Sequence, residues 1–318
     1  MKSFLVLLFF VVANARAEFD KISSTSVSSN EGFRLYEKAK KEVDELNKKY
    51  LGATFAINKF SFMSENERKK HLSPSLSIPT SLKFATFDDE NITAPESFDF
   101  RKSGKVTPVK DQTLSGTSGC GSCFAFAATG AVESQYLIKQ NLELDLSEEY
   151  LLECDTADAE CGGGLENNSL NVYINNGVPS EACIPYTGTE GKCPDIADTE
   201  VCKKYKIAGY KTLGDDEDKY PGMLFKYGPI AIGMNAGAPL QFYHKGVLDI
   251  PLKECGDGGH AVLLVGYTKD YWIAKNSWGS KHGENGYFRF KRGVNFCNFA
   301  KYDPMIPYLS DPTNVLES

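Results

Sequence analysis

Hydrophobic periodicity predicts a long amphipathic helix near the beginning of the chain. Between Glu31 and Tyr50, apolar side chains recur at spacings of three and four residues, so one face of this helix can dock on another part of the protein. Farther on, the alternating apolar stretch from Phe55 to Phe62 predicts a strand, and residues Glu65 to His71 predict a short helix. The segment from Ser73 to Pro95 is rich in Pro, Ser, Thr and Asp and has the composition of a linker.

After Pro95 the pattern changes from a helical half to a β-rich half. In residues 96–205, Cys123 opens an apolar run that predicts a buried central helix, and Ser147 to Leu152 begin a second helix with Ser147 as its N-cap. Residues 206–303 contain short apolar runs bounded by Gly, Asp and Lys, which predict strands at Pro229–Met234, Ala261–Tyr267, Tyr271–Ala274 and Gly286–Lys291. These halves predict an α+β body with a cleft between them.

The first 17 residues have the pattern of a targeting segment. Lys2 supplies a positive flank, Phe4 to Val12 form an almost unbroken apolar run, and Ala15-Arg16-Ala17 place small residues at a cleavage spacing. This apolar run is too short to span a bilayer, so we expect a signal peptide at residues 1–17; a buried strand or a short anchor is the alternative. No later segment has the length and apolar character of a membrane span, and none is predicted.

Cysteine usage divides the 318-residue chain further. All nine cysteines lie at or after Cys120, and residues 18–93 contain none. An oxidising compartment favours disulfides, and an odd number leaves at least one thiol without an internal partner. A cysteine-free leader before such a body predicts a removable pro-segment at residues 18–93, although a small N-terminal domain that stays attached is an alternative. The net charge of −7 argues against nucleic acid as a partner.

Cys123 is the candidate nucleophile, because this residue lies where a Gly-rich loop enters an apolar helix. A thiol attacks an amide carbonyl as the thiolate, and a helix N-terminus and a neighbouring imidazolium both stabilise that anion. Among the three histidines after residue 93, His260 opens a buried-strand pattern and lies 137 residues after Cys123, within the roughly 130–150 expected of a Cys–His arrangement. Asn276 follows as the residue that orients the His260 ring, with Trp278 to shield their hydrogen bond from water.

Alternative readings of the cysteines find less support. A zinc site lacks the short paired spacing of ligands, so no metal and no cofactor are predicted. Cys120 and Cys123 form a C-x-x-C pair, but a thioredoxin-like role needs a βαβ context that the sequence does not provide.

These residues lie in motifs that resemble those of the papain/cathepsin family of cysteine peptidases. The blocks follow the family order from about residue 95 to residue 303, and weaker similarity to the family propeptide lies at Asn58–Phe60 and Ser64–Glu67. The blocks are Pro108-Val109-Lys110-Asp111-Gln112, Gly119-Cys120-Gly121-Ser122-Cys123-Phe124-Ala125-Phe126, Gly259-His260-Ala261-Val262, Asn276-Ser277-Trp278-Gly279 and Glu284-Asn285-Gly286-Tyr287.

The resemblance implies a fold, an activity and roles for further residues. The fold would have a helical lobe (about residues 94–205) and a β-barrel-like lobe (about 206–303) within a mature domain at 94–318, with an inhibitory pro-segment before it. Gln112 would donate to the oxyanion together with the backbone N–H of Cys123, and Gly163, Gly164, Leu165, Trp278 and Tyr302 would contact substrate. The implied disulfides are Cys120–Cys161, Cys154–Cys193, Cys255–Cys297 and, less typically, Cys183–Cys202.

The implied protein is a secreted or lysosomal endopeptidase, made as a zymogen and monomeric. Its partners would be protein or peptide substrates, its own pro-segment and cystatin-like inhibitors, without nucleic acid or, after removal of the signal peptide, a membrane. A non-catalytic homologue that binds or serves a structural role is the alternative. The sequons at Asn91 and Asn167 predict glycosylation.

Four departures from the family pattern bear on the site. Thr113 to Thr117 form an insertion after Gln112, which either displaces that side chain or bulges into solvent; the small polar residues favour the bulge. Phe124 and His282 each replace a family Trp, and His282 is expected either to contact the leaving group or to be a solvated loop residue. Residues 165–167 replace an aromatic wall, so the substrate preference does not carry over.

Overall fold

The computed structural model describes residues 29–74, 92–114, 119–197 and 199–310. The predicted signal peptide, most of the predicted linker and the sequon at Asn91 lie outside these residues. The helices of the described part are α2 (Ser29–Lys49), α3 (Glu65–Lys69), α4 (Cys123–Lys139), α5 (Glu148–Cys154), α6 (Glu166–Asn175), α7 (Tyr220–Tyr227) and α8 (Ala238–Gln241). The strands are β1 (Ala53–Phe55), β2 (Phe98–Asp99), β3 (Gly209–Thr212), β4 (Ile230–Ala236), β5 (Tyr243–Leu248), β6 (Gly258–Tyr267), β7 (Tyr271–Lys275), β8 (Tyr287–Lys291) and β9 (Met305–Tyr308).

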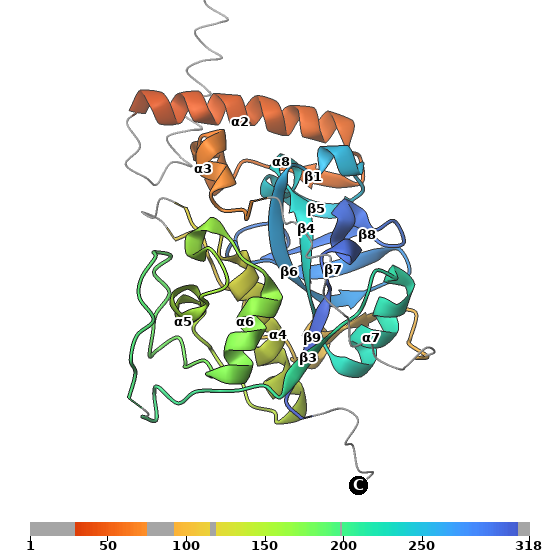
Figure 1. Ribbon diagram of the computed structural model, residues 1–318. Coiled ribbons are helices and arrows are strands. Elements are labelled where there is room, and N and C mark those ends of the chain that lie inside the picture. Colours follow the sequence, from red (N-terminus) through yellow and green to blue (C-terminus); the bar gives the residue numbers. More distant parts are fainter. Residues whose placement is uncertain (1–28, 75–91, 115–118, 198, 311–318) are drawn as a thin grey trace, which may run out of the picture.

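Residues 29–74, which we call the N-terminal segment, begin with the predicted amphipathic helix. Helix α2 lies across the β-rich part of the molecule (Figure 1), and its apolar side chains Ala39 and Val43 join the core of that part. The short helix α3 was also predicted, two residues longer at its end. The first helix therefore docks through its apolar face on the rest of the protein.

The predicted strand at 55–62 is wrong, because a side-chain cap interrupts it. Strand β1 ends at Phe55, and Asn58 then caps a 3₁₀ helix at Lys59–Phe62 by accepting a hydrogen bond from the backbone N–H of Phe60 at 2.9 Å. The backbone N–H of Asn58 donates in turn to the Ser61 hydroxyl at 3.1 Å. A short polar side chain that offers the backbone these bonds competes with strand pairing, which alternation of apolar residues does not reveal.

The helical lobe is built around α4. From Cys123 to Leu137 every residue of α4 is buried, because α5 and α6 cover it on one side and strands of the sheet on the other. In α5, the Ser147 hydroxyl accepts a hydrogen bond from the backbone N–H of Tyr150 at 3.0 Å, so this N-cap was predicted correctly. The helix that begins at Cys123 is thus held on all sides, which fixes the position of its first residue.

The β lobe is an open sheet with nine strands in the described residues. The strand order is β1-β5-β8-β7-β6-β4-β9-β3, with β2 paired to β6, so the expected barrel-like lobe is not a closed barrel. All four predicted strands are present, as β4, β6, β7 and β8. Strand β2 lies at the start of the half predicted to be helical (residues 94–205) and pairs with β6, so that half contributes a strand to the sheet. Strand β9 lies beyond residue 303 and pairs with β3, so the sheet extends past the predicted end of the β lobe. The fold is α+β with two lobes, as predicted.

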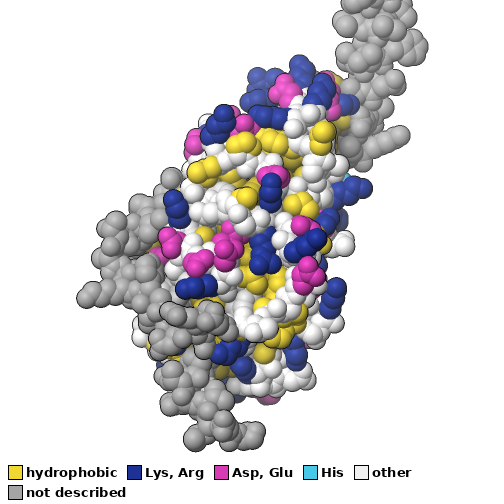
Figure 2. All heavy atoms as spheres, turned by 90° about the vertical axis from the view of Figure 1, so that its right-hand side faces the viewer, with side chains coloured by type: hydrophobic (Ala, Val, Ile, Leu, Met, Phe, Trp, Pro, Cys, Tyr) yellow, Lys and Arg dark blue, Asp and Glu magenta, His cyan; other side chains and the backbone are white. Residues whose placement is uncertain are grey.

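The surface of the described residues mixes charges of both signs. On the face that Figure 2 shows, Lys and Arg side chains alternate with Asp and Glu side chains. No helix in the described part of the chain is both long enough and apolar enough to cross a membrane.

Candidate active site

The candidate nucleophile, Cys123, is the first residue of α4. Its side chain is fully buried, and its Sγ atom lies 3.6 Å from the Oγ atom of Ser73 in the N-terminal segment. The N-cap residue Ser122 makes no side-chain capping bond, so the positive end of the helix dipole is directed at the Cys123 sulfur without competition from a cap. The position favours an anion at the sulfur once the site is open to water.

His260 and Asn276 come together from neighbouring strands of the β lobe. His260 is the third residue of β6, and Asn276 follows the last residue of β7. The His260 Nε2 atom lies 2.8 Å from the Asn276 Oδ1 atom, and the Trp278 ring stacks on the imidazole at 4.4 Å between centroids. The other ring nitrogen of His260, Nδ1, is buried and has no hydrogen-bond partner among the described residues. It is therefore the nitrogen available to exchange a proton with a thiol.

Burial keeps both members of this pair neutral while the N-terminal segment is in place. Burial raises the pKa of the Cys123 thiol, against the opposing effect of the Ser73 hydroxyl and the Ala261 backbone. Burial also lowers the pKa of His260 to about 4, although the hydrogen bond to Asn276 raises it. Both shifts have the same cause, because removal from water disfavours the charged form of either group. The thiolate–imidazolium pair predicted from the sequence is therefore not the state of this closed form.

Gln112 points into the same site. Its side chain is fully buried, and Nε2 donates to the backbone carbonyls of Cys120 at 3.0 Å and His71 at 3.3 Å. Its Oε1 atom accepts a hydrogen bond from the Ser277 hydroxyl at 2.6 Å, which fixes the amide orientation. Residues 115–118 of the insertion after Gln112 lie outside the described residues.

The N-terminal segment runs through the cleft between the lobes. Ser73 pairs with Gly259 through two backbone hydrogen bonds of 2.8 Å, directly beside His260. On the opposite wall, a Cβ atom on Gly163 would lie 2.8 Å from both the Ser73 hydroxyl and the Pro74 ring, and the φ of +108° at Gly163 also favours glycine. The cleft thus binds an extended chain at close backbone approach, as a peptide substrate requires.

The remaining residues predicted to bind substrate have different surroundings. A Cβ atom on Gly164 would collide with the carboxylate of Asp158, so this glycine is required by the protein's own packing. Leu165 is half-buried before α6, and the Tyr302 hydroxyl donates to Asn235 Oδ1 at 3.1 Å. Asn167, the second sequon asparagine, lies partly buried in the first turn of α6, with its amide donating to Asn168 at 3.0 Å.

Four disulfides surround the site in the pairs implied by the resemblance. In the described residues, Cys123 is the free cysteine. Cys120–Cys161 ties the loop before α4 to the segment of Gly163 and thereby holds the cleft wall next to Cys123. The other pairs are Cys154–Cys193, Cys183–Cys202 and Cys255–Cys297.

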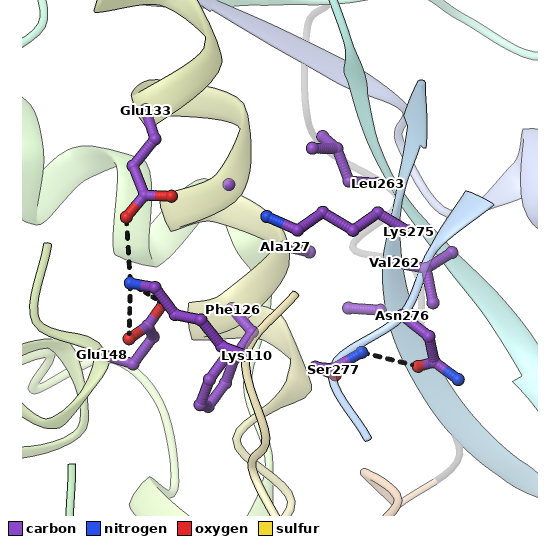
Figure 3. A pocket seen from close by; sticks show the side chains of 12 residues that line it. Lys110, Phe126, Ala127, Glu133, Glu148, Val262, Leu263, Lys275, Asn276 and Ser277 are labelled. Carbon is purple, nitrogen blue, oxygen red and sulfur yellow. Dashed lines mark hydrogen bonds and ion pairs between the residues drawn. The ribbon is translucent and has the colours of Figure 1, made fainter. Parts of the chain in front are cut away.

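A buried charged cluster, which sequence reasoning missed, lies behind the site between the lobes. The Lys110 ammonium contacts Glu133 at 2.9 Å and Glu148 at 3.0 Å, and Figure 3 shows Lys275 extending from β7 toward α4. Burial lowers the pKa of Lys275 to about 8. These residues line a cavity of about 20 Å³ that also borders Asn276 and Ser277. Four separate segments contribute to the cluster, so it cannot be predicted from a local sequence motif.

His282 departs from its expected environment. The solvated-loop interpretation is wrong, since only 2% of this residue is exposed. Its ring meets Trp278 edge-on at 4.9 Å and lies 3.4 Å, through Nδ1, from the Nδ2 atom of Asn276. The replacement of Trp by Phe124 leaves an aromatic residue fully buried beside Cys123.

Comparison with known proteins agrees with this geometry. The pattern of the family described as "Papain family cysteine protease" matches residues 94–306. A viral cathepsin of Adoxophyes honmai nucleopolyhedrovirus is 34% identical over 88% of this chain and 85% of its own length, and cysteine proteinase 1 of Dictyostelium discoideum is 35% identical over 86% and 85%. The digestive procathepsin L2 proteinase from Tenebrio molitor larval midgut superposes with a TM-score of 0.79 at 31% identity, covering 93% of this chain and 98% of the other. The chain belongs to the papain family of cysteine proteases.

Proposed function

We propose that this cysteine protease is an endopeptidase in which Cys123 is the nucleophile and His260 its acid–base partner. One observation carries the assignment. His260 contacts Asn276 through Nε2, and its Nδ1 atom has no hydrogen-bond partner among the described residues. The next residue along the chain, Ala261, lies close enough to Cys123 for its backbone to lower the pKa of the thiol. A nucleophile, a base and an orienting amide in this order form the arrangement that covalent amide hydrolysis requires.

The proposed reaction proceeds through a thioester. The Cys123 thiolate adds to the peptide carbonyl, and the imidazolium of His260 protonates the leaving amine. Water then attacks the thioester, with His260 as the general base, and Cys123 is released. Gln112 donates its amide N–H to the substrate oxygen that becomes negative in the transition state. In the closed form the His71 carbonyl oxygen occupies this position, 3.3 Å from Gln112 Nε2.

The N-terminal segment is proposed to be the inhibitory part of a pro-segment at residues 18–93. It occupies the cleft, pairs with Gly259 and buries Cys123, so a substrate cannot enter while it is bound. Removal at acid pH would open the site. We further propose passage through the secretory pathway, to the outside of the cell or to a lysosome or vacuole, with a signal peptide at 1–17, glycosylation at Asn91 and Asn167, a monomeric mature form and cystatin-like inhibitors.

The test is acid activation of the full chain, followed by an assay on peptides that contain internal cleavage sites. We expect the wild-type protein to cut within these peptides and the Cys123→Ala variant to remain uncut and inactive. His260→Ala should lose activity as well, whereas His244→Ala, a matched change at an exposed histidine of β5, should retain it. A thiol-directed epoxide should label wild-type protein at Cys123 after activation. Unlabelled, inactive wild-type protein would favour the non-catalytic binding role, and activity that survives Cys123→Ala would refute the assignment.

A further inference from the structure

His282 completes a chain of hydrogen bonds that ends at the candidate base. Its Nε2 atom lies 3.1 Å from the backbone carbonyl oxygens of Leu240 and Gln241, at the end of α8. Its Nδ1 atom lies 3.4 Å from Asn276 Nδ2, and Asn276 Oδ1 lies 2.8 Å from His260 Nε2. The three side chains therefore connect two backbone carbonyls to the catalytic imidazole.

Backbone groups at both ends of this chain fix its direction. The carbonyl oxygens of Leu240 and Gln241 only accept, so His282 Nε2 carries the proton and Nδ1 is an acceptor. The backbone N–H of Ser277 only donates, and it donates to Asn276 Oδ1 at 2.8 Å, so Nδ2 of the same amide faces His282. Asn276 Oδ1 then accepts the Nε2 proton of His260, and Nδ1 of His260 is left free of a proton.

We propose that His282 is a positioning residue, which holds the Asn276 amide in the orientation that fixes the His260 tautomer. The inference rests on the proposed function of Cys123 and His260. A tryptophan, which the resemblance leads one to expect at this position, cannot accept a hydrogen bond from Asn276, because the indole nitrogen only donates. The substitution in this chain thus adds an acceptor to the site and does not merely replace one ring by another.

The surroundings of His282 keep it in the neutral form that this role needs. Burial lowers the pKa of His282 to about 4, and Lys59 acts in the same direction, against the opposing effect of the Gln241 and Leu240 carbonyls. The other rings against it are Phe60 and Trp278, which carry no charge. Lys59 and Phe60 belong to the N-terminal segment, so they leave on activation, whereas α8, Asn276 and Trp278 remain. Protonation of Nδ1 would set two donors against each other at Asn276 Nδ2.

Kinetics of the activated enzyme test the proposal through two variants at one position. His282→Phe keeps a ring against Trp278 and removes both hydrogen bonds, whereas His282→Asn restores a side-chain acceptor. We expect His282→Phe to lower kcat/KM about tenfold, mainly through kcat, as for one lost hydrogen bond that orients the base. The alkaline limb of the pH profile should move to lower pH by roughly half a unit, because the Asn276 bond raises the pKa of His260. His282→Asn should recover most of both changes, and the matched control His244→Phe should leave both unchanged.

A second measurement determines the tautomer of His282 without changing that residue. Nitrogen NMR of ¹⁵N-histidine-labelled Cys123→Ala zymogen at neutral pH should show His282 with its proton on Nε2 and a proton-free Nδ1. A proton on Nδ1 overturns the proposal, and so does a His282→Phe enzyme with unshifted pH limbs or a His282→Asn enzyme no better than His282→Phe. If wild-type protein shows no Cys123-dependent cleavage, the proposed function fails instead, and the NMR result still decides the tautomer.

Discussion

The Oγ atom of Ser73 lies 3.6 Å from the Sγ atom of Cys123, so a hydroxyl of the N-terminal segment covers the proposed nucleophile. This contact excludes water from the sulfur, and the pKa of the Cys123 thiol rises as a result of that burial. The same segment pairs with Gly259 beside His260, whose pKa burial lowers to about 4. The proposed inhibition would therefore have two parts: the segment fills the cleft, and burial favours the neutral forms of Cys123 and His260.

Removal of the N-terminal segment should turn a neutral pair into an ion pair. Relief of burial lowers the pKa of Cys123 and raises that of His260, so near pH 6 the mature enzyme should hold thiolate and imidazolium together. We expect iodoacetamide to alkylate the mature enzyme at pH 6 at least on the order of 100-fold faster than the zymogen, because the thiolate is the reactive form and burial disfavours it in the zymogen. Alkylation rates measured between pH 4 and pH 9 check this, with Cys123→Ser as the control for the labelled site. Equal alkylation rates in the zymogen and the mature enzyme would contradict the neutral Cys123 thiol expected in the zymogen.

Gln112 should act in the transition state more than in substrate binding. Substitution of Gln112 by Ala removes the donor that faces the His71 carbonyl in the closed form, and loss of one such donor typically costs about 10²–10³ in kcat. We expect kcat of the activated Gln112→Ala enzyme to fall by roughly 100-fold with little change in KM. Steady-state kinetics on one peptide measure both, and Gln140→Ala, at an exposed glutamine that ends α4, is the matched control. A change confined to KM would remove Gln112 from the oxyanion site.

Lys59 should strengthen the hold of the N-terminal segment on the mature domain. Its ammonium lies 2.8 Å from Asp111 Oδ1 and also donates to the Thr113 hydroxyl, beside the insertion. Partly exposed ion pairs contribute on the order of 1 kcal/mol or less, so Lys59→Met should speed acid activation of the zymogen about threefold. Lys69→Met is the control, because Lys69 pairs with Glu65 inside the same segment. Activation half-times at several salt concentrations measure the effect, and wild-type half-times in Lys59→Met would argue against this contact.

Glu166 should make the folded protein less stable at neutral pH. Burial raises the pKa of this carboxyl to about 8, with smaller contributions from Asp158 and Asp303. Below pH 4.5, the pKa of this group in the unfolded chain, Glu166 does not reduce the free energy of unfolding. Between pH 4.5 and about 8 the unfolded state loses the proton first, so the free energy of unfolding falls as the pH rises. Glu166→Gln should therefore stabilise the protein by on the order of a few kcal/mol at pH 8 and by almost nothing at pH 4.

Urea denaturation of the zymogen at several pH values measures this difference. The Cys123→Ala background prevents self-cleavage during the experiment. Glu143→Gln, at an exposed glutamate, serves as the matched control and should give the same stability as its parent at each pH. A Glu166→Gln protein whose advantage does not grow with pH would show that burial of this carboxyl is not the cause.

Local motifs could predict the residues that the structure brings together at the cleft, because each motif fixes a side chain at the end of one element. Cys123 opens a helix, and His260 and Asn276 lie at ends of adjacent strands. Contacts between distant segments could not be predicted in this way. The sequence predicts a solvated residue at His282, between Lys281 and Gly283, but Phe60, Trp278 and the end of α8 bury it.

The same limit applies to the fold. The apolar runs revealed β4, β6, β7 and β8, whereas β2, with two residues, and β1, with three, are too short for alternation to be seen. Those short strands exist because β6 and β5 offer them backbone partners, and a partner is not visible in the segment itself. The charged cluster at Lys110 and Glu133 is invisible for a similar reason, since its members become neighbours only after the lobes have assembled.

Strand β1 determines whether β5 is an interior strand or an edge strand of the sheet. Its residues Ala53, Thr54 and Phe55 pair with β5, and Gly52, just before the strand, accepts a hydrogen bond from the Val247 N–H at 2.7 Å. Removal of the proposed pro-segment would turn β5 from an interior strand into an edge strand whose backbone amides and carbonyls face water. Exposed edge strands tend to pair with other chains, and the exposed side chains of His244 and Lys245 on β5 make such pairing with a second copy unfavourable. Activation would thus expose a sheet edge to water, and the charge of Lys245 would oppose pairing of two mature molecules along it.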